Sequence, residues 1–124
     1  MARHFSVDEA NALLPRLRSI IEAALTARQR IIDAQPEVWP VLEKAIGNGG
    51  SRKAGELVED FKAIERGVKA IQDLGVVVKD INTGLLDFPA LRGDREVFLC
   101  WRFGEPAVAF WHELHTGFAG RQPL

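Results

Sequence analysis

The sequence has a single cysteine, Cys100, so the chain cannot form an intrachain disulfide. It has no apolar run near the roughly 20 residues that a bilayer-spanning helix needs. Its opening residues, MARHFSVDEA, lack the apolar core of a signal peptide. We therefore expect a cytoplasmic protein that does not insert into membranes.

An excess of charge of either sign is also missing. Sixteen basic and seventeen acidic residues give a formal net charge of −1 at pH 7. Without a positive field the chain has no general attraction for phosphate backbones, so we do not expect it to bind nucleic acid. The glycine-rich stretch from Gly47 to Ser51 lacks the spacing of a phosphate-binding P-loop, and we interpret it as a loop between helices.

The composition is typical of one folded, soluble domain. Of the 124 residues, 47% are hydrophobic and 27% are charged, and this length suffices for a single core. We expect one domain over residues 1–124, with helices at about 6–75, strands at about 76–115 and a C-terminal tail at 116–124.

The first third of the chain has the pattern of a long amphipathic helix. Ser6 and Glu9 form the sequence signature of a capping box at its start. Pro15 removes a backbone donor, so we expect a kink there in a helix that continues to about Ala34. Apolar residues recur every three or four positions, which places them on one face: Ala10, Leu13, Leu14, Leu17, Ile20, Ile21, Ala24, Leu25, Ile31 and Ile32.

A short helical stretch follows Pro36, and a second long helix is expected from about Lys53 to Leu74, with Gly75 ending it. Two amphipathic helices joined by a short connection pack antiparallel, so we predict a long helical hairpin. The apolar positions of the second helix alternate by four and three, close to a coiled-coil seam: Leu57, Phe61, Ile64, Val68 and Ile71.

After Gly75 the hydrophobic period changes to that of strands. We expect four strands, at 76–81, 85–88, 96–102 and 107–114, and Pro89 is expected to end the second of them. Sequential short strands favour an antiparallel meander with one face on the helices. The predicted fold class is α+β, a long antiparallel helical hairpin packed against a small four-stranded antiparallel sheet.

The register of the first hairpin has two alternatives. A three-residue loop over 82–84 places Ile81 opposite Leu85 and Lys79 opposite Asp87, which gives an ordinary cross-strand ion pair. A shorter loop of Thr83 and Gly84 places Asp80 directly opposite Asp87, and two carboxylates that close need a cation or a shared proton. The first register has the better turn chemistry, and we favour it.

Oxygen and imidazole groups gather in the half of the chain that also contains two of the three tryptophans. We predict a divalent-metal site of Asp80, Asp87, Glu105 and His112, a donor set that suits zinc, manganese or iron. Arg121 is expected to fold back and present its guanidinium to an anion, or else to fray with the tail. The residues that we predict for a small-molecule site are Glu105, His112, Arg121, Trp101 and Trp111.

His115 and Cys100 have less support as site residues. His112 and His115 point to opposite faces of a strand, so they do not form a joint chelate there. Cys100 lies between Leu99 and Trp101, where a free thiol is usually a small buried apolar group and less often a nucleophile.

Three stretches of the sequence are distinctive. They are FSVDEANALLP from Phe5, GVVVKDINTGLLDFPAL from Gly75 and VFLCWRFGEPAVAFWHELHTGFAGRQP from Val97. Together they resemble a bacterial family of uncharacterised proteins, domain-of-unknown-function family 2203. The resemblance covers nearly the whole chain except about Pro36 to Arg52, and it implies a whole member of that family without implying a reaction.

Three functions follow from these observations as hypotheses. The first is a small binding protein with a ligand or divalent-metal site on the sheet half. The second is self-association into a homo-oligomer, or protein interaction, through the apolar stripe of the second long helix. The third is a hydrolase or transferase that uses His112 or Cys100, for which the sequence has no nucleophile-and-base spacing.

Overall fold

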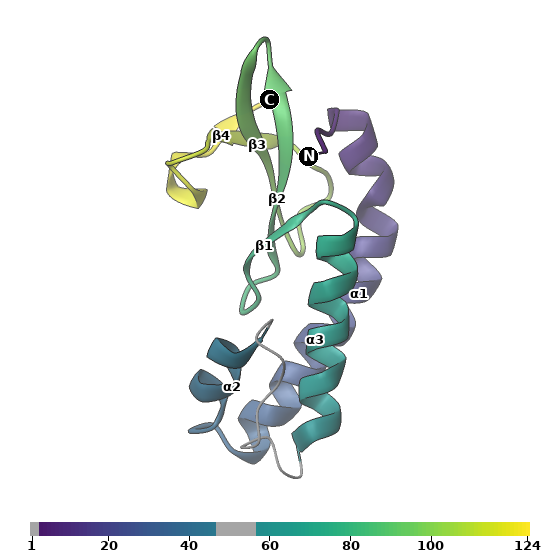
Figure 1. The fold of residues 1–124 in the computed structure, drawn as a ribbon, viewed down its shortest axis with the longest axis vertical. Coiled ribbons are helices and arrows are strands. Elements are labelled where there is room, and N and C mark those ends of the chain that lie inside the picture. The colour runs from purple at the N-terminus through teal and green to yellow at the C-terminus, as the bar shows by residue number, and fades with distance from the viewer. Residues whose placement is uncertain (1–2, 47–56) are drawn as a thin grey trace.

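The computed structural model describes residues 3–46 and 57–124, and it has an α+β fold (Figure 1). The expected loop at 47–51 and the start of the second long helix at 53–56 lie outside these residues. The elements are α1 (Val7–Ala34), α2 (Trp39–Ala45), α3 (Val58–Asp73), β1 (Val77–Asp80), β2 (Leu85–Arg92), β3 (Arg95–Arg102), β4 (Phe110–Glu113), the 3₁₀ turn η2 (Phe118–Gly120) and β5 (Gln122–Pro123).

Helix α1 begins and ends where its sequence predicts. The Ser6 side chain accepts a hydrogen bond from the Glu9 N–H (3.0 Å), and the Ser6 N–H donates to the Glu9 carboxylate (2.9 Å), which confirms the capping box. The helix continues past Pro15 to Ala34. Its buried residues all belong to the predicted stripe except Ala27, and they are Ala10, Leu14, Leu17, Ile21, Ala24, Ala27 and Ile31. The other residues of the predicted stripe, Leu13, Ile20, Leu25 and Ile32, are partly buried against the core.

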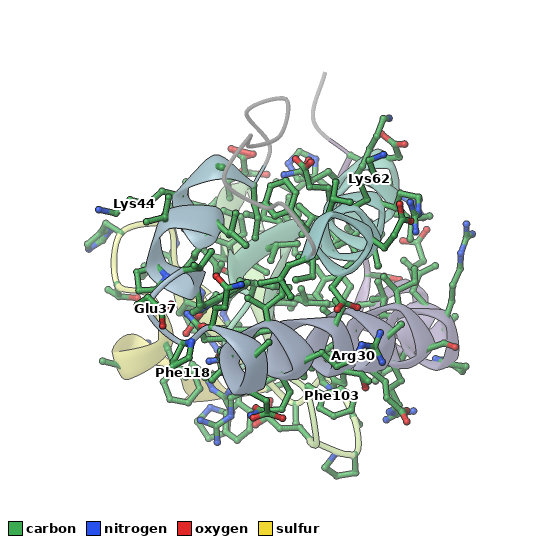
Figure 2. The ribbon with its side chains drawn as sticks, turned by 90° about the horizontal axis from the view of Figure 1, so that it is seen from below. Arg30, Glu37, Lys44, Lys62, Phe103 and Phe118 are labelled. Atoms are coloured by element: carbon green, nitrogen blue, oxygen red, sulfur yellow. The ribbon has the colours of Figure 1, made fainter. Side chains whose placement is uncertain are left out.

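Helices α1 and α3 lie side by side and run in opposite directions, but α2 lies between them in the chain, so they are not a simple hairpin (Figure 1). Figure 2 shows Lys62 of α3 projecting away from α1. The whole apolar stripe of α3 is buried within this chain: Leu57, Phe61, Ile64, Val68 and Ile71. Self-association was predicted because this stripe would be free for a partner, and the stripe is instead covered within the chain. Self-association therefore stays a prediction without that support.

The antiparallel sheet has five strands in the order β1-β2-β3-β4-β5, where four were expected. The extra strand, β5, comes from the predicted tail and pairs with β4. The fourth strand is shorter than predicted, because the Val108 N–H donates to the Asn11 side chain of α1 (2.8 Å) and so does not join the ladder. No helix within residues 3–46 and 57–124 is long and apolar enough to cross a membrane.

The prediction that Pro89 ends the second strand is wrong. Strand β2 continues to Arg92, and Pro89 pairs with Phe98. The carbonyl oxygen of Pro89 accepts a hydrogen bond from the Phe5 N–H (2.7 Å), so the edge of Pro89 that lacks a donor faces away from β3. The proline therefore removes no bond from the β2–β3 ladder.

Both predicted registers of the first hairpin are also wrong. The residue opposite Asp87 is Val77, whereas the two registers predicted Lys79 or Asp80 there. Asp80 instead pairs with Leu85, after an irregularity in β1. Gly84 explains part of the difference, because it is buried with a φ of +70°, and a Cβ there would lie 2.7 Å from Cβ of Phe103. The turn is thus fixed by its packing as well as by its local turn chemistry.

The sheet has two different faces. One face packs on α1 and α3 and contributes Leu86, Phe88, Val97, Leu99 and Trp101 to the main core. The C-terminal segment lies on the other side of the sheet from these helices, in yellow in Figure 1. Polar side chains of β2, β3 and β4 meet on this second face, and they form the candidate site.

Candidate functional site

Three buried side chains meet on the sheet face that points away from the helices. In the ladders Asp87 of β2 is opposite Cys100 of β3, and His112 is on the neighbouring strand β4, opposite Phe98. A carboxylate oxygen of Asp87, the sulfur of Cys100 and a ring nitrogen of His112 all lie within 4.8 Å of one another. The exposed fractions are 1% for Asp87, 0% for Cys100 and 1% for His112. We call these three residues the Asp87 cluster.

The hydrogen bonds of His112 fix where its protons can be. Its Nδ1 lies 2.7 Å from the Glu113 carbonyl oxygen, which can only accept, so Nδ1 carries a proton and donates. Its Nε2 lies 3.0 Å from Oδ1 of Asp87. Both of these atoms have lone pairs, so a proton or a cation has to lie between them.

Asp87 has an unusual second oxygen. Oδ2 is buried and has no hydrogen-bond partner among the described residues. No other buried side-chain oxygen or nitrogen in residues 3–46 and 57–124 lacks a partner. Leaving a buried acceptor unpaired costs roughly 1–3 kcal/mol. Oδ2 is therefore an acceptor atom that a ligand at the Asp87 cluster could use.

Cys100 is held as a thiol. Burial raises its pKa from the ordinary 9.0 to about 12, and the negative charge of Asp87 acts in the same direction. Nucleophilic catalysis needs the thiolate, which is scarce at neutral pH under these conditions. The hydrolase or transferase hypothesis thus gains no support from Cys100.

Arg121 does fold back over the sheet, and the anion that it meets belongs to the same chain. Its guanidinium donates to both carboxylate oxygens of Glu105, at 3.1 and 2.6 Å, and Nη1 lies 4.0 Å from the Cys100 sulfur. The rings of Phe110 and Phe118 lie 3.9 and 4.6 Å from the guanidinium carbon. The prediction of a frayed tail is therefore not what the structure has.

The Glu105 carboxylate is kept charged by these contacts. Burial alone would raise its pKa, but hydrogen bonds from Arg121 and from the Arg102 N–H, together with the Arg121 charge, lower the pKa below its ordinary value. Burial alone would lower the pKa of Arg121, and the bonds to Glu105 raise it instead. The pair is a charge-assisted, two-pronged contact of the strong kind.

The predicted metal quartet is therefore divided. Asp87 and His112 come together, with Cys100 as a third member that the sequence reasoning had not considered as a ligand. Glu105 reaches this cluster only through Arg121, and the Asp80 carboxylate accepts hydrogen bonds from the Asn82 N–H (2.9 Å) and the Thr83 hydroxyl. Within the described residues, neither Asp80 nor Glu105 belongs to the close group of donors.

The two tryptophans of the predicted small-molecule site point to the other face of the sheet. Trp101 is buried in the main core and its Nε1 donates to the Glu105 carbonyl oxygen (2.9 Å). Trp111 pairs with Leu99 and lies beneath the guanidinium of Arg92. Both residues therefore have structural roles and lie apart from the Asp87 cluster, and His115 is exposed beyond the end of β4.

A second polar cluster, centred on Asn82, was missed by the sequence reasoning. The Asn82 side-chain oxygen accepts from Nε of Arg28 (2.8 Å) and from Nε1 of Trp39 (2.9 Å), and its amide nitrogen donates to Glu43 (2.6 Å). We call these four residues the Asn82 cluster. It ties α1 and α2 to the turn between β1 and β2, and the hairpin tip points toward α2 in Figure 1.

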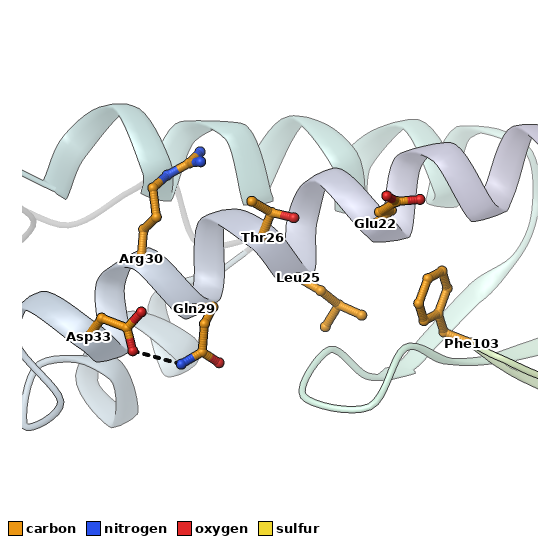
Figure 3. A pocket seen from close by; sticks show the side chains of 7 residues that line it. All are labelled: Glu22, Leu25, Thr26, Gln29, Arg30, Asp33 and Phe103. Carbon is orange, nitrogen blue, oxygen red and sulfur yellow. Dashed lines mark hydrogen bonds between the residues drawn. The ribbon is translucent and has the colours of Figure 1, made fainter.

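An open groove of about 420 Å³ runs along α1 (Figure 3). Leu25 points toward Phe103 across it, and Gln29 donates to Asp33 (2.8 Å) on its rim. Arg30 pairs with Asp60 of α3 (2.8 Å). Three of the polar residues that line the groove, Gln29, Arg30 and Asp33, therefore already have partners, and the groove contains none of the predicted site residues.

The comparisons with known proteins place the chain in a family and go no further. No curated protein and no solved structure matches the sequence. Residues 3–124 match the family described as uncharacterized conserved protein (DUF2203), in agreement with the resemblance of the three distinctive stretches. Because this match spans nearly the whole chain, the protein belongs to the DUF2203 family.

Proposed function

We propose that this protein binds one divalent metal ion, zinc before manganese or iron, through Asp87, Cys100 and His112. The observation that carries the proposal is the buried contact between Nε2 of His112 and Oδ1 of Asp87 (3.0 Å), which needs one proton or one cation between its two atoms. A metal ion between them would replace the proton that otherwise has to be shared. The unpaired Oδ2 of Asp87 supports the same assignment.

Charge balance favours a divalent ion. Binding would convert Cys100 to a thiolate, since a coordinating thiol is deprotonated outright, and Asp87 would contribute a second negative charge. Two negative ligands and a neutral imidazole offset a dication completely. A neutral assembly matters here because all three residues are buried, where an uncompensated charge is very costly.

The ligand types and their support also favour zinc. A sulfur, a nitrogen and an oxygen donor suit zinc well, whereas manganese prefers oxygen ligands. The Nδ1–H of His112 donates to the Glu113 carbonyl oxygen, which orients the ring with Nε2 toward the cluster, as metal-binding histidines require. In a tetrahedral zinc site the ligand atoms lie roughly 3.3–3.8 Å apart, so side-chain shifts of about 1 Å would complete the arrangement.

Cobalt(II) is a suitable probe because its complexes with thiolate ligands absorb light in the near ultraviolet. We expect chelator-treated protein, purified without an affinity tag, to bind one cobalt ion with a sulfur-to-metal absorption band and to release it to zinc. Binding should also release two protons, one from Cys100 and one from the His112–Asp87 contact, as measured by calorimetry in buffers of different ionisation enthalpy.

Matched variants distinguish metal binding at the Asp87 cluster from metal binding by surface histidines or by groups other than the thiol. Cys100→Ser and His112→Gln should each weaken binding by about 100-fold, and Cys100→Ser should also abolish the absorption band. His115→Gln removes an exposed histidine three residues away and should leave binding unchanged. Failure of the wild-type protein to take up a stoichiometric metal ion would overturn the proposal.

A further inference from the structure

The three residues of the Asp87 cluster are at most 1% exposed in the part of the chain that the structure describes, so none of them faces solvent directly. Any ion or reagent that reaches Cys100 must therefore first displace the side chains that cover it. On the outer side of the sheet, Nη1 of the Arg121 guanidinium lies 4.0 Å from the Cys100 sulfur. Arg121 belongs to the C-terminal segment, residues 114–124, which crosses this side of the sheet (Figure 1).

The C-terminal segment is attached by few contacts. Its strand β5 has two residues, and these pair with Phe110 and Trp111, while the Leu124 N–H donates to the Ala109 carbonyl oxygen (3.0 Å). Phe118 is 41% exposed although it packs on Arg121. Segments with little buried surface and few backbone hydrogen bonds open at a small fraction of the free energy of global unfolding.

The strongest of these contacts is the pair between Arg121 and Glu105. Glu105 is itself fixed to the body of the domain, because its carbonyl oxygen accepts from Trp101 (2.9 Å) and its side chain accepts from the Arg102 N–H (2.7 Å). The pair therefore joins a weakly attached segment to a firmly held turn. Gly117, with a φ of +64° and no described atom near its Cβ position, lies between this pair and β4 and leaves room for a hinge.

We propose that the Arg121–Glu105 pair is a latch that closes the C-terminal segment over Cys100 and controls how fast a metal ion enters and leaves the Asp87 cluster. The identity of the ion rests on the proposed function, but the control of access to the thiol does not. Opening moves Arg121 off the sulfur and exposes the cluster. Closing restores the two-pronged contact and excludes water.

Two variants test the latch, and each has a distinct purpose. Arg121→Ala removes the guanidinium, whereas Glu105→Gln breaks the charged contact but keeps the Arg121 charge beside Cys100. A rate increase shared by both variants cannot then come from loss of that charge. The control is Arg95→Ala, which breaks an ion pair of similar length, Arg95 to Glu113 (2.7 Å), on the opposite face of the neighbouring strands.

The first readout is the rate at which a small aromatic disulfide reagent labels Cys100 in metal-free protein. We expect about tenfold faster labelling in both latch variants, because loss of the two-pronged contact makes opening of the segment more frequent, and no change in Arg95→Ala. Tenfold corresponds to ~1.4 kcal/mol. In the wild-type protein the labelling rate should be independent of low urea concentrations, because local opening exposes little surface.

The second readout is metal exchange, measured as the rates of cobalt uptake and of cobalt removal by a chelator. Both rates should rise about tenfold in the latch variants while the dissociation constant stays within about threefold, because a gate changes both directions equally. Equal labelling and exchange rates in wild type and both variants would overturn the latch. A wild-type labelling rate that follows the urea dependence of global unfolding would also overturn it, even if a variant failed to fold.

These outcomes separate the latch from the proposed function. Faster labelling in both variants without any metal uptake would support the latch and refute the metal site. Stoichiometric metal uptake with unchanged labelling and exchange rates would support the metal site and refute the latch.

Discussion

Asn82 and Asp87 lie on the same hairpin, yet the two clusters around them differ in how far their polar atoms are satisfied. In the Asn82 cluster the side-chain oxygen of Asn82 accepts two hydrogen bonds and its amide nitrogen donates a third. In the Asp87 cluster one oxygen of Asp87 has no partner among the described residues, and the other faces a histidine nitrogen.

The difference separates a structural role from a binding role. A satisfied polar network fixes the positions of the elements that it joins, and the Asn82 cluster joins α1, α2 and the first hairpin. A buried network with unpaired acceptor atoms stabilises the fold less, since each unpaired buried group lowers the free energy of unfolding. Such a network becomes favourable when a ligand uses those lone pairs, which is the reason to expect a metal ion at Asp87.

The largest effect on stability is expected at the satisfied cluster. Asn82→Ala leaves Nε1 of Trp39 and Nε of Arg28 without their acceptor and removes the donor to Glu43. We expect the free energy of unfolding to fall by about 3 kcal/mol, on the scale of two partly buried unsatisfied groups. Urea denaturation followed by circular dichroism would measure it.

The matched control for Asn82→Ala is Gln29→Ala on the exposed face of α1, which removes one hydrogen bond to Asp33 and should change stability by at most about 0.5 kcal/mol. Metal binding should be the same in both variants. If Asn82→Ala cost no more than Gln29→Ala, the view of the Asn82 cluster as the structural one of the two would fail.

A second effect should appear at alkaline pH and depend on Cys100. Its folded pKa is about 12 and its ordinary value is 9.0, so above pH 9 the unfolded thiol loses its proton while the folded one keeps it. The unfolded state then binds fewer protons, and metal-free stability falls as pH rises from about 9 to 12, by about 1.4 kcal/mol per pH unit at most.

The Cys100→Ala variant isolates this contribution, because other groups that titrate at high pH are the same in both proteins. Thermal or urea unfolding between pH 8 and 10.5 should give a steeper loss of stability for the wild type than for Cys100→Ala. Parallel pH profiles would mean that Cys100 ionises as readily in the folded chain as in the unfolded one, and that its burial does not protect the thiol.

The helical half was predictable because its signals are local. The capping box at Ser6, the apolar stripe of α1 and the helix end at Gly75 each depend on residues within one or two turns. The strands were harder, because their limits depend on partners far away in the sequence. The Phe5 N–H lets Pro89 stay in β2, and Asn11 keeps Val108 out of β4.

The site was only partly predictable, because the sequence shows the chemistry of each residue but not which residues meet. Asp87, Glu105, His112 and Arg121 were chosen for their chemistry, but only the tertiary register decides which of them meet. One signal was overlooked: a two-residue turn at Gly93 and Asp94 places Asp87 opposite Cys100 by counting back along both strands, as the structure does. The fifth strand had no such signal, because its two residues pair only after the tail has folded back.

The most discriminating prediction makes the same substitution at Asp87 and at Asp80, which accepts a hydrogen bond from the Asn82 N–H, and expects opposite signs. Asp87→Asn can donate from its new amide to Nε2 of His112 and removes a buried carboxylate with an unpaired oxygen. Without metal, we expect the free energy of unfolding to rise by about 1 kcal/mol. Cobalt affinity should fall at least tenfold, since an amide is a weaker ligand than a carboxylate.

Asp80→Asn is the partner experiment. Both Asp80 oxygens already accept hydrogen bonds, from the Asn82 N–H and the Thr83 hydroxyl, so replacing one acceptor by a donor should lower stability by about 1 kcal/mol and leave cobalt affinity unchanged. Urea denaturation of both variants in chelator, followed by cobalt titration, gives both quantities. If Asp87→Asn were destabilised as much as Asp80→Asn, the Asp87 carboxylate would be stabilising the metal-free fold, and the contrast between a structural cluster and a binding cluster would not hold.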